Sequence, residues 1–455
     1  MAGSNLPQAN LWEAIVQTGN PRLDSRSGQI AIMLALCLVP LFGVVGLVTD
    51  IGYMRFIKMS AQTAAEAAAM ATIDDMHATL GGAITSCGGG VVCASTATAC
   101  TANITTPTNS VQRGCMYAQK HGFNGSNQVT YQSGIGGTPP TATGAASASY
   151  WVTFRVIQTV PQMFSAVVGN TSGIVAARSS AAILGASDCV YAMNPNQSGA
   201  LQIGGSASLT SSCGLFVNSN NTSALGTNGG GTLTAPEYDV VGGVSTHYTL
   251  TPSPNTGVSP TTDPLSYLPV PASPPYTCDY TNYSASNWSN PTLSAGVYCG
   301  GINVGNNTFT LNPGTYILVG GGLSTQSSNS TITGTGVTFY NTYDSTYAYA
   351  PISIAANSNV TLKAPNSGTY AGILFFEDRS APASSDTYGG GSSAVYQGVI
   401  YAKNAAITMY GNSSINTKYT LIVADTISLV GSTALNSDYS LLPNGSPITR
   451  IAMVE

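Results

Sequence analysis

One uninterrupted apolar segment dominates the N-terminal part of the chain. Residues 30–49 read IAIMLALCLVPLFGVVGLVT and contain no charged side chain, with Arg26 before the run and Asp50 directly after it. As a helix rising about 1.5 Å per residue, a run of this length spans the roughly 30 Å hydrocarbon layer of a bilayer. Pro40 interrupts the run, but transmembrane helices tolerate proline. The pattern predicts a membrane-spanning helix, with a cleaved signal peptide or a buried core helix as the alternatives.

The segment after this run continues the helical pattern. Residues 50–80 are rich in alanine, the best helix former. An apolar stripe recurs at spacings of four and three, through Ile57, Ala61, Ala64, Ala68 and Ala71. We therefore expect one helix over residues 30–80, partly in the bilayer and partly projecting from it, after a cytoplasmic segment over residues 1–29.

Residues 81–185 predict a small α+β unit. Residues 81–149 are rich in Gly, Thr, Ser and Ala and hold four cysteines, which is typical of loops pinned by disulfides. Residues 150–157 have strand composition, residues 161–168 form a helical pattern led by proline, and residues 173–184 favour a second strand.

From residue 186 onward, short apolar pieces alternate with Ser, Thr, Asn and Gly. Each coil of a parallel β-helix supplies short strands of this kind, with β-branched residues inside and Asn or Gly at the corners. The pattern predicts a mainly β fold, a right-handed parallel β-helix over residues 186–455, with a β-sandwich as the alternative. Eight prolines between Thr249 and Tyr276 predict an excursion between two groups of coils, or a loop folded over the β-helix side.

Composition narrows the possible partners. Charged residues make up 7% of the chain and the net charge is −5, which argues against nucleic acid because neutralising phosphates requires a basic face. A hydrophobic content of 43% argues against general disorder. From Ser179 to Leu362 there is no Lys or Arg.

The cysteines orient the chain, since basic residues are balanced across the apolar run. Of nine cysteines, Cys37 lies in the run and the other eight follow it, which suits disulfides in an oxidising compartment. We therefore expect the C-terminal region in the periplasm or outside the cell. Proximity favours the pairs Cys189–Cys213 and Cys278–Cys299, although the connectivity stays open. With three histidines and no C-x2-C motif, we expect no metal site.

Paired carboxylates are the candidates for catalysis, because glycoside hydrolysis needs two acids on one face, about 5–9.5 Å apart. Glu237 and Asp239 share one face of a strand, whereas the adjacent Glu377 and Asp378 point to opposite sides. We favour solvated corners, or a salt bridge with Arg379, for these acids. We predict no catalytic residue and no cofactor.

Seven N-terminal residues fall in a specific order around the apolar run. They are Gly28, Pro40, Gly46, Asp50, Gly52, Gln62 and Glu66. Their arrangement resembles the N-terminal segment of TadG-like proteins of the Tad (tight adherence, Flp) pilus system, which usually carry Asp in place of Glu66. The resemblance covers roughly residues 26–75. It implies a membrane anchor whose motif residues are those seven.

The resemblance also bears on processing and on the exterior. Type IV-like prepilins are cut after a Gly and carry Glu as the fifth residue of the mature chain. The fifth residue after Gly28 is Met33, so we expect the segment to be retained. Residues 312–322, 334–339 and 372–379 are similar to β-helical exteriors of some TadG-like proteins. The Asp-x-Ser-x-Ser metal motif of other members is absent, so its metal site is not carried over.

The resemblance implies a single-pass protein of the bacterial inner membrane that serves pilus assembly or pilus-associated adhesion without being an enzyme. Its partners would be the membrane and pilin-like or Tad secretion-system proteins. Tyr343, Tyr347 and Tyr349 form a candidate stacking patch for a surface polysaccharide, with ordinary aromatic packing as the alternative. A membrane-tethered carbohydrate-active or carbohydrate-binding β-helix, and a surface adhesin unrelated to pili, are the alternative functions.

Overall fold

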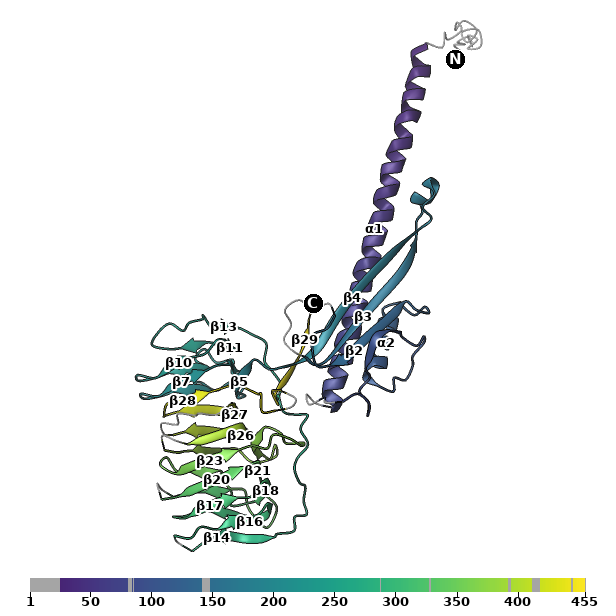
Figure 1. Cartoon of the computed structure of the whole chain (residues 1–455). Coiled ribbons are helices and arrows are strands. Elements are labelled where there is room, and N and C mark those ends of the chain that lie inside the picture. The colour runs from purple at the N-terminus through teal and green to yellow at the C-terminus, as the bar shows by residue number, and fades with distance from the viewer. Residues whose placement is uncertain are drawn as a thin grey trace, which may run out of the picture. The chain divides into compact units, whose positions relative to one another are not determined.

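The computed structural model describes residues 25–80, 84, 86–140, 148–286, 288–326, 329–391, 394–410, 418–442 and 445–454. The chain divides into two compact units, one running to Thr63 with Val156–Ala177 and the other comprising Ala64–Arg155 with Arg178 onward. Helix α1 (Ser25–Leu80) and strands β3 (Ala148–Pro161) and β4 (Ser172–Gly185) contribute to both (Figure 1). The prediction of a mainly β chain with an N-terminal apolar helix is confirmed.

The first unit combines the apolar part of α1 with a hairpin. Strands β3 and β4 are joined through the 3-10 helix η1 (Ser165–Val168), which ends at Gly169 with φ +94°. The helix predicted over residues 161–168 is thus present only as the 3-10 helix Ser165–Val168, and Pro161 belongs to β3 instead. The Gln162 amide donates to the Thr171 carbonyl at 3.0 Å, so pairing between the two arms continues past Pro161 and shortens the helical segment between them.

The second unit contains the five-stranded sheet of the small α+β region. Its order is β1 (Ala94–Ala99), β2 (Val129–Ile135), β3, β4 and β29 (Thr449–Met453). Helix α2 (Ser110–Lys120) begins after Asn109, whose side chain accepts the Gln112 amide. A Cβ at Gly114 of α2 would overlap the Thr72 hydroxyl of α1, so this glycine lets the two helices approach closely. Strand β29 pairs antiparallel with β4, a pairing that the sequence did not indicate.

The rest of the second unit is a set of short strands in parallel ladders, which we call the strand stack (residues 188–435). One ladder runs through β14 (Tyr280–Ser284), β16 (Gly296–Asn303), β18 (Gly314–Val319), β21 (Val337–Thr342), β24 (Ile373–Glu377), β26 (Val395–Met409), β27 (Thr420–Leu429), β5 (Asp188–Ala192), β8 (Gly214–Val217), β11 (Tyr238–Val240) and β13 (Asn255–Thr256). The described pairings of this ladder are parallel, unlike the hairpins expected of a β-sandwich.

Further parallel ladders lie alongside. One comprises β19 (Leu323–Ser324), β22 (Ser353–Ile354), β25 (Ser384–Tyr388), the second halves of β26 and β27, β6 (Leu201–Ile203), β9 (Leu225–Thr227) and β12 (Val244–Ser245). Another comprises β15 (Thr292–Leu293), β17 (Thr308–Leu311), β20 (Thr331–Thr335) and β23 (Asn359–Lys363). A short one comprises β28 (Thr433–Leu435), β7 (Ser208–Ser211) and β10 (Thr232–Thr234).

Chain order and ladder order differ in the stack. The chain enters at β5 and proceeds to β13 at one end, and residues 257–279 then lead to β14 at the other end (Figure 1). From β14 it returns strand by strand to β27, which pairs with β5 and β6. We call residues 257–279 the strap. Its Leu265 and Leu268 are buried in an apolar cluster of the stack, so it both connects two groups of coils and folds over their side.

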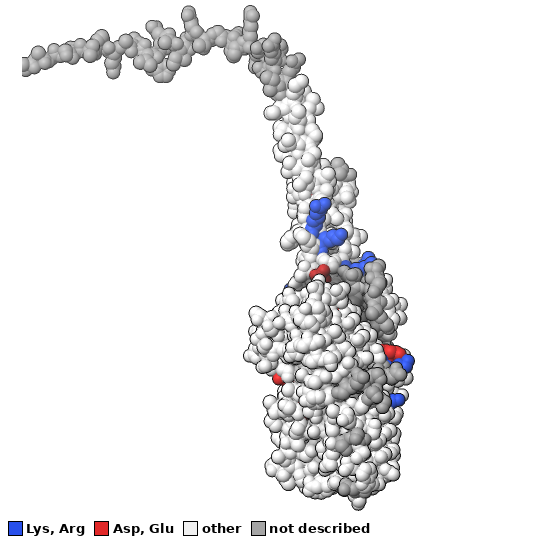
Figure 2. All heavy atoms as spheres, turned by 90° about the vertical axis from the view of Figure 1, so that its left-hand side faces the viewer, with Lys and Arg blue, Asp and Glu red and all other residues white. Residues whose placement is uncertain are grey.

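Aromatic rings fill the stack in a column. The ring centroids of Tyr280, Tyr298, Tyr316, Phe339 and Phe375 follow one another at 4.6, 5.9, 5.5 and 5.0 Å. Such offset contacts add to the free energy of apolar burial. Charged side chains are sparse on the face of the stack seen in Figure 2, as the composition requires.

Disulfides join neighbouring elements throughout the second unit. The pairs are Cys87–Cys93, Cys100–Cys115, Cys189–Cys213 and Cys278–Cys299. The last two are the pairs that sequence proximity favoured. Among the described residues, the cysteine without a disulfide is Cys37, in the apolar run.

Candidate functional site

The outward apolar side chains of α1 form an anchor surface. Large hydrophobic residues from Ile32 to Val48 expose between 39% and 70% of their surface within the chain. Within the described residues, α1 is the helix long and apolar enough to cross a membrane. Pro40 lies inside it, and the helix continues through that position. Gly28 lies near its start.

Asp50, at the end of the apolar run, binds the turn of the β3–β4 hairpin. Its carboxylate accepts the amides of Met163, Phe164 and Ser165 at 3.1, 3.1 and 2.7 Å. The side chain is 5% exposed, so the charge is covered by the turn. Three donors to one carboxylate compensate for the water that Asp50 loses.

Gly46 lies one turn before Asp50 on the same face of α1. A Cβ at Gly46 would overlap the Phe164 ring, so only glycine lets that ring contact the helix backbone. One turn after Asp50, Met54 Sδ accepts a hydrogen bond from Gln162 at 2.9 Å. Positions 46, 50 and 54 therefore make one docking strip for the hairpin, which we call the hairpin seat.

The other motif residues lie elsewhere on α1. A Cβ at Gly52 would have no atom within 4 Å, and the same holds for Gly43. Gln62 is half-buried and Glu66 is exposed. The sequence motif thus contains two residues of the hairpin seat, Gly46 and Asp50. Sequence reasoning missed their partner, Phe164, which lies inside the segment predicted as a helix.

The hairpin turn carries apolar side chains that the chain leaves uncovered. Met163 is 73% exposed, Val167 86% and Ile174 71%. They belong to the same unit as the hairpin seat, whose Gly46 is part of the apolar run. Exposed apolar residues beside a membrane-spanning segment are suited to the lipid interface.

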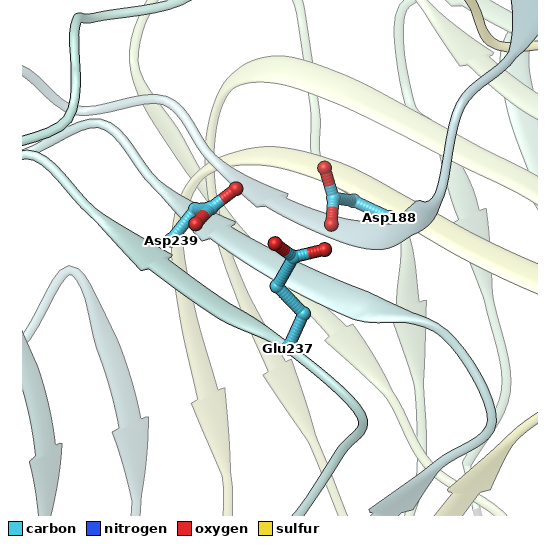
Figure 3. A group of neighbouring side chains, drawn as sticks. All are labelled: Asp188, Glu237 and Asp239. Carbon is cyan, nitrogen blue, oxygen red and sulfur yellow. The ribbon is translucent and has the colours of Figure 1, made fainter. Parts of the chain in front are cut away.

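Glu237 and Asp239, the first acid pair, are joined by a residue that the sequence analysis did not single out. Carboxylate oxygens of Asp188, Glu237 and Asp239 lie within 4.8 Å of one another (Figure 3). Asn255 Nδ2 donates to Asp239 at 2.9 Å and to Glu237 at 3.4 Å. Burial, with the charges of Asp239 and Glu237, raises the pKa of Asp188 to about 6.

The second acid pair is divided between two environments, since Glu377 ends β24 and Asp378 follows it. The solvated corner or Arg379 salt bridge that we favoured is wrong for Glu377, because Glu377 is buried and Arg379 lies 3.7 Å from Asp263. Glu377 is 3% exposed and accepts the Tyr349 hydroxyl. Burial and the nearby charge of Asp386 raise the pKa of Glu377, and burial raises that of Asp386. Burial opposes ionisation of Asp378, but hydrogen bonds from Ser380, Thr342 and Tyr340 hold its pKa below the usual value.

The tyrosines of the proposed sugar patch interact within the protein. The rings of Tyr343 and Tyr349 meet edge to face, with centroids 6.1 Å apart. Their hydroxyls donate to the Ser380 carbonyl and to Glu377. These contacts match the aromatic-packing alternative.

Comparison with known proteins identifies the anchor segment. Residues 28–73 match the Tad family model, described as Flp pilus-assembly TadE/G-like. The chain therefore carries a Tad domain near its N-terminus, consistent with a TadG-like protein. No curated protein and no solved structure matches the chain.

Proposed function

We propose that this chain is a membrane-anchored, non-enzymatic component of Tad/Flp pilus assembly or of pilus-associated adhesion. One observation carries the proposal. The Tad match at residues 28–73 contains Gly46, Asp50 and Met54, whose contacts attach the β3–β4 hairpin to the membrane-spanning part of α1. The anchor motif is therefore also a structural motif.

The proposed topology is a single pass through the bacterial inner membrane. Residues 1–29 would lie in the cytoplasm, residues 30–80 would form the anchor helix, and residues 81–185 and 186–455 would lie in the periplasm or outside. Four disulfides, all after the apolar run, support this orientation because thiols stay reduced in the cytoplasm. The exposed Met163 and Val167 would then lie at the lipid headgroups.

The strand stack would act as a rigid exterior. We assign it as a parallel β-helix, supported by its parallel ladders and its column of aromatic rings. In such a stack each strand is held by both neighbours, which suits a spacer or an adhesive surface. Pilin-like or Tad secretion-system proteins are the proposed partners, docking through the anchor helix or the hairpin.

The test is fractionation of cells that carry the chain with a C-terminal tag, separating sheared pili, membranes and medium. We expect a full-length chain in the inner membrane, degraded by protease only after the outer membrane is opened. We also expect loss of pili on deletion and recovery with the wild-type chain. Normal pili after deletion would overturn the role in assembly, leaving adhesion to be measured on the same strain.

The mass of the chain decides whether it is an anchor or a filament subunit. A retained anchor keeps its full mass and stays with membranes after shearing. A chain shortened near Gly28 that sediments with sheared pili would overturn retention and make the protein a pilus subunit.

A further inference from the structure

Three acidic side chains converge at the edge of the strand stack where the chain enters it. Asp188 begins β5, and Glu237 and Asp239 come from the β11 segment, two strands away in the same ladder. Glu237 and Asp239 are two residues apart in extended chain, so they share a face. Figure 3 shows the three carboxylates directed toward one another. Their oxygens lie within 4.8 Å of one another.

Asp188 is the least compensated of the three. It is 8% exposed, and its Oδ1 accepts no hydrogen bond from any described residue. A buried carboxylate oxygen without a donor is costly, and two further carboxylates beside it increase that cost. Among the described residues, Arg450 is the cation whose charge favours ionisation of Asp188, whereas Glu237 and Asp239 oppose it. The buried oxygen therefore points to a missing positive partner.

Gly214 provides the space for the Asp188 carboxylate. It lies opposite Asp188 in the β5–β8 register, and its Cβ would overlap Asp188 Oδ1 and come within 3.5 Å of the Glu237 Cβ. The absence of a side chain at Gly214 thus leaves room for the Asp188 carboxylate beside Glu237. The Cys189–Cys213 disulfide links the residues directly after Asp188 and directly before Gly214. A covalent bond therefore joins the two strands on which Asp188 and Gly214 lie opposite each other.

The ligand chemistry is that of a hard cation. The three groups offer only carboxylate oxygens, and the neighbouring Cys189 is in a disulfide and offers no thiolate. Zinc and other softer metals prefer sulfur or imidazole ligands. Calcium takes six to eight oxygens in flexible geometry, whereas magnesium needs a near-ideal octahedron. The partly exposed Asp239 and the exposed Glu237 leave room for water to complete a calcium shell.

We propose that Asp188, Glu237 and Asp239 bind one Ca²⁺ ion at the β5–β8–β11 edge of the strand stack. The ion links the entry strand of the stack to a strand two places farther along the ladder. It therefore stabilises the coils between β5 and β13. This site is independent of the hairpin seat and of the role in pilus assembly.

The test is calorimetric titration of the full chain in a non-ionic detergent, after removal of divalent ions with a chelator. We expect one Ca²⁺ per chain, with a Kd between about 10⁻⁵ and 10⁻³ M. We also expect a rise in the unfolding temperature with added Ca²⁺. Glu237→Gln removes an exposed ligand without disturbing the core, and we expect at least tenfold weaker binding. Asp188→Asn should do the same.

The matched control is Asp279→Asn, which removes a carboxylate that accepts the Val297 amide at the β14 end of the stack. We expect it to bind Ca²⁺ like the wild type. The proposal is overturned if the wild type gives neither heat nor a thermal shift with millimolar Ca²⁺, or if Glu237→Gln binds as tightly as the wild type. Equal affinity for Mg²⁺ would overturn the assignment to calcium.

Discussion

At the scale of single residues, the end of the apolar run shows why the Asp50 carboxylate is tolerated in a covered position. An isolated buried carboxylate would be costly, but this one receives three backbone amides from the hairpin turn. Gly46 has no side chain and therefore leaves space for the Phe164 ring against the helix. Asp50 thus binds the hairpin turn through its charge, and Gly46 allows the same turn to approach the helix.

Gly46→Leu tests the hairpin seat. The added side chain would meet Phe164, and overpacking of this kind costs about 1–3 kcal/mol. We expect hydrogen exchange over residues 162–171 to rise by roughly tenfold in detergent-solubilised chain. Gly43→Leu is the matched control, because a Cβ there meets no atom within 4 Å. Equal exchange in the two variants would show that the hairpin does not depend on Gly46.

The raised pKa of Glu377 predicts that the free energy of unfolding depends on pH. Its folded pKa is raised by burial, so above about pH 4.3 the unfolded chain loses a proton that the folded chain keeps. Stability should therefore fall as pH rises from that value toward the folded pKa, and Asp386 adds to the trend. Glu377→Gln stays neutral, and we expect it to be more stable than the wild type at pH 8, on the order of 2 kcal/mol.

Urea unfolding of the wild type and Glu377→Gln at pH 5 and pH 8 measures this effect. The two proteins should be nearly equal at pH 5 and differ at pH 8. Asp74→Asn, which removes an exposed carboxylate from α1, should keep the pH dependence of the wild type. A variant Glu377→Gln with that same dependence would mean that Glu377 is not the group responsible.

At the scale of elements, the sequence predicts those helices and strands that follow from a local pattern of apolar and polar residues. Residues 30–80 are helical in the structure because both the apolar run and the alanine stripe favour a helix, and Ala61, Ala64 and Ala68 are buried. The strand patterns at residues 150–157 and 173–184 lie inside β3 and β4. The helix predicted at residues 161–168 is limited to the 3-10 helix Ser165–Val168, because cross-strand pairing extends to Gln162 and overrides the local preference there.

Pairing between segments that are distant in the sequence could not be predicted from local patterns. Strand β29 pairs with β4, although the whole strand stack lies between them in the sequence. No local pattern marks β29 as part of that sheet. Asp188 meets Glu237 and Asp239 only because β5, β8 and β11 are stacked in one ladder. The face shared by Glu237 and Asp239 followed from strand periodicity, but the third acid depended on register.

The strap depends on one arginine. Arg379 Nη2 donates to the carbonyls of Leu265 and Leu268, and its Nε lies 3.7 Å from the buried Asp263 carboxylate. Arg379→Ala leaves these acceptors without that donor, so we expect limited proteolysis of the strap to become several-fold faster. Lys403→Ala is the control, since Lys403 is 41% exposed and lies 3.8 Å from the same carboxylate. Equal cleavage rates in both variants would contradict this role of Arg379.

At the scale of the strand stack, the route of the chain differs from the order of its coils. The run from β14 to β27 ends against β5 and β6, where the stack begins in sequence. The two runs are therefore held together by strand pairing in the middle of the stack as well as by the strap. Neither disulfide of the stack joins the two runs, because Cys189–Cys213 lies in one run and Cys278–Cys299 links the end of the strap to β16 in the other.

Cutting the strap separates these two contributions. A protease site replacing residues 270–275, which precede β14, would divide the chain into two fragments with no disulfide between them. We expect the fragments to elute together under native conditions, because β27 still pairs with β5 and β6, and to separate in denaturant. Ile422→Asp places a charge at the fully buried position that pairs with Val190, and should weaken the association of the cut fragments, which β28–β7 and β29–β4 pairing still support. If the unmodified fragments fell apart on cleavage, the strap would be the main link and the central pairing only a weak contact.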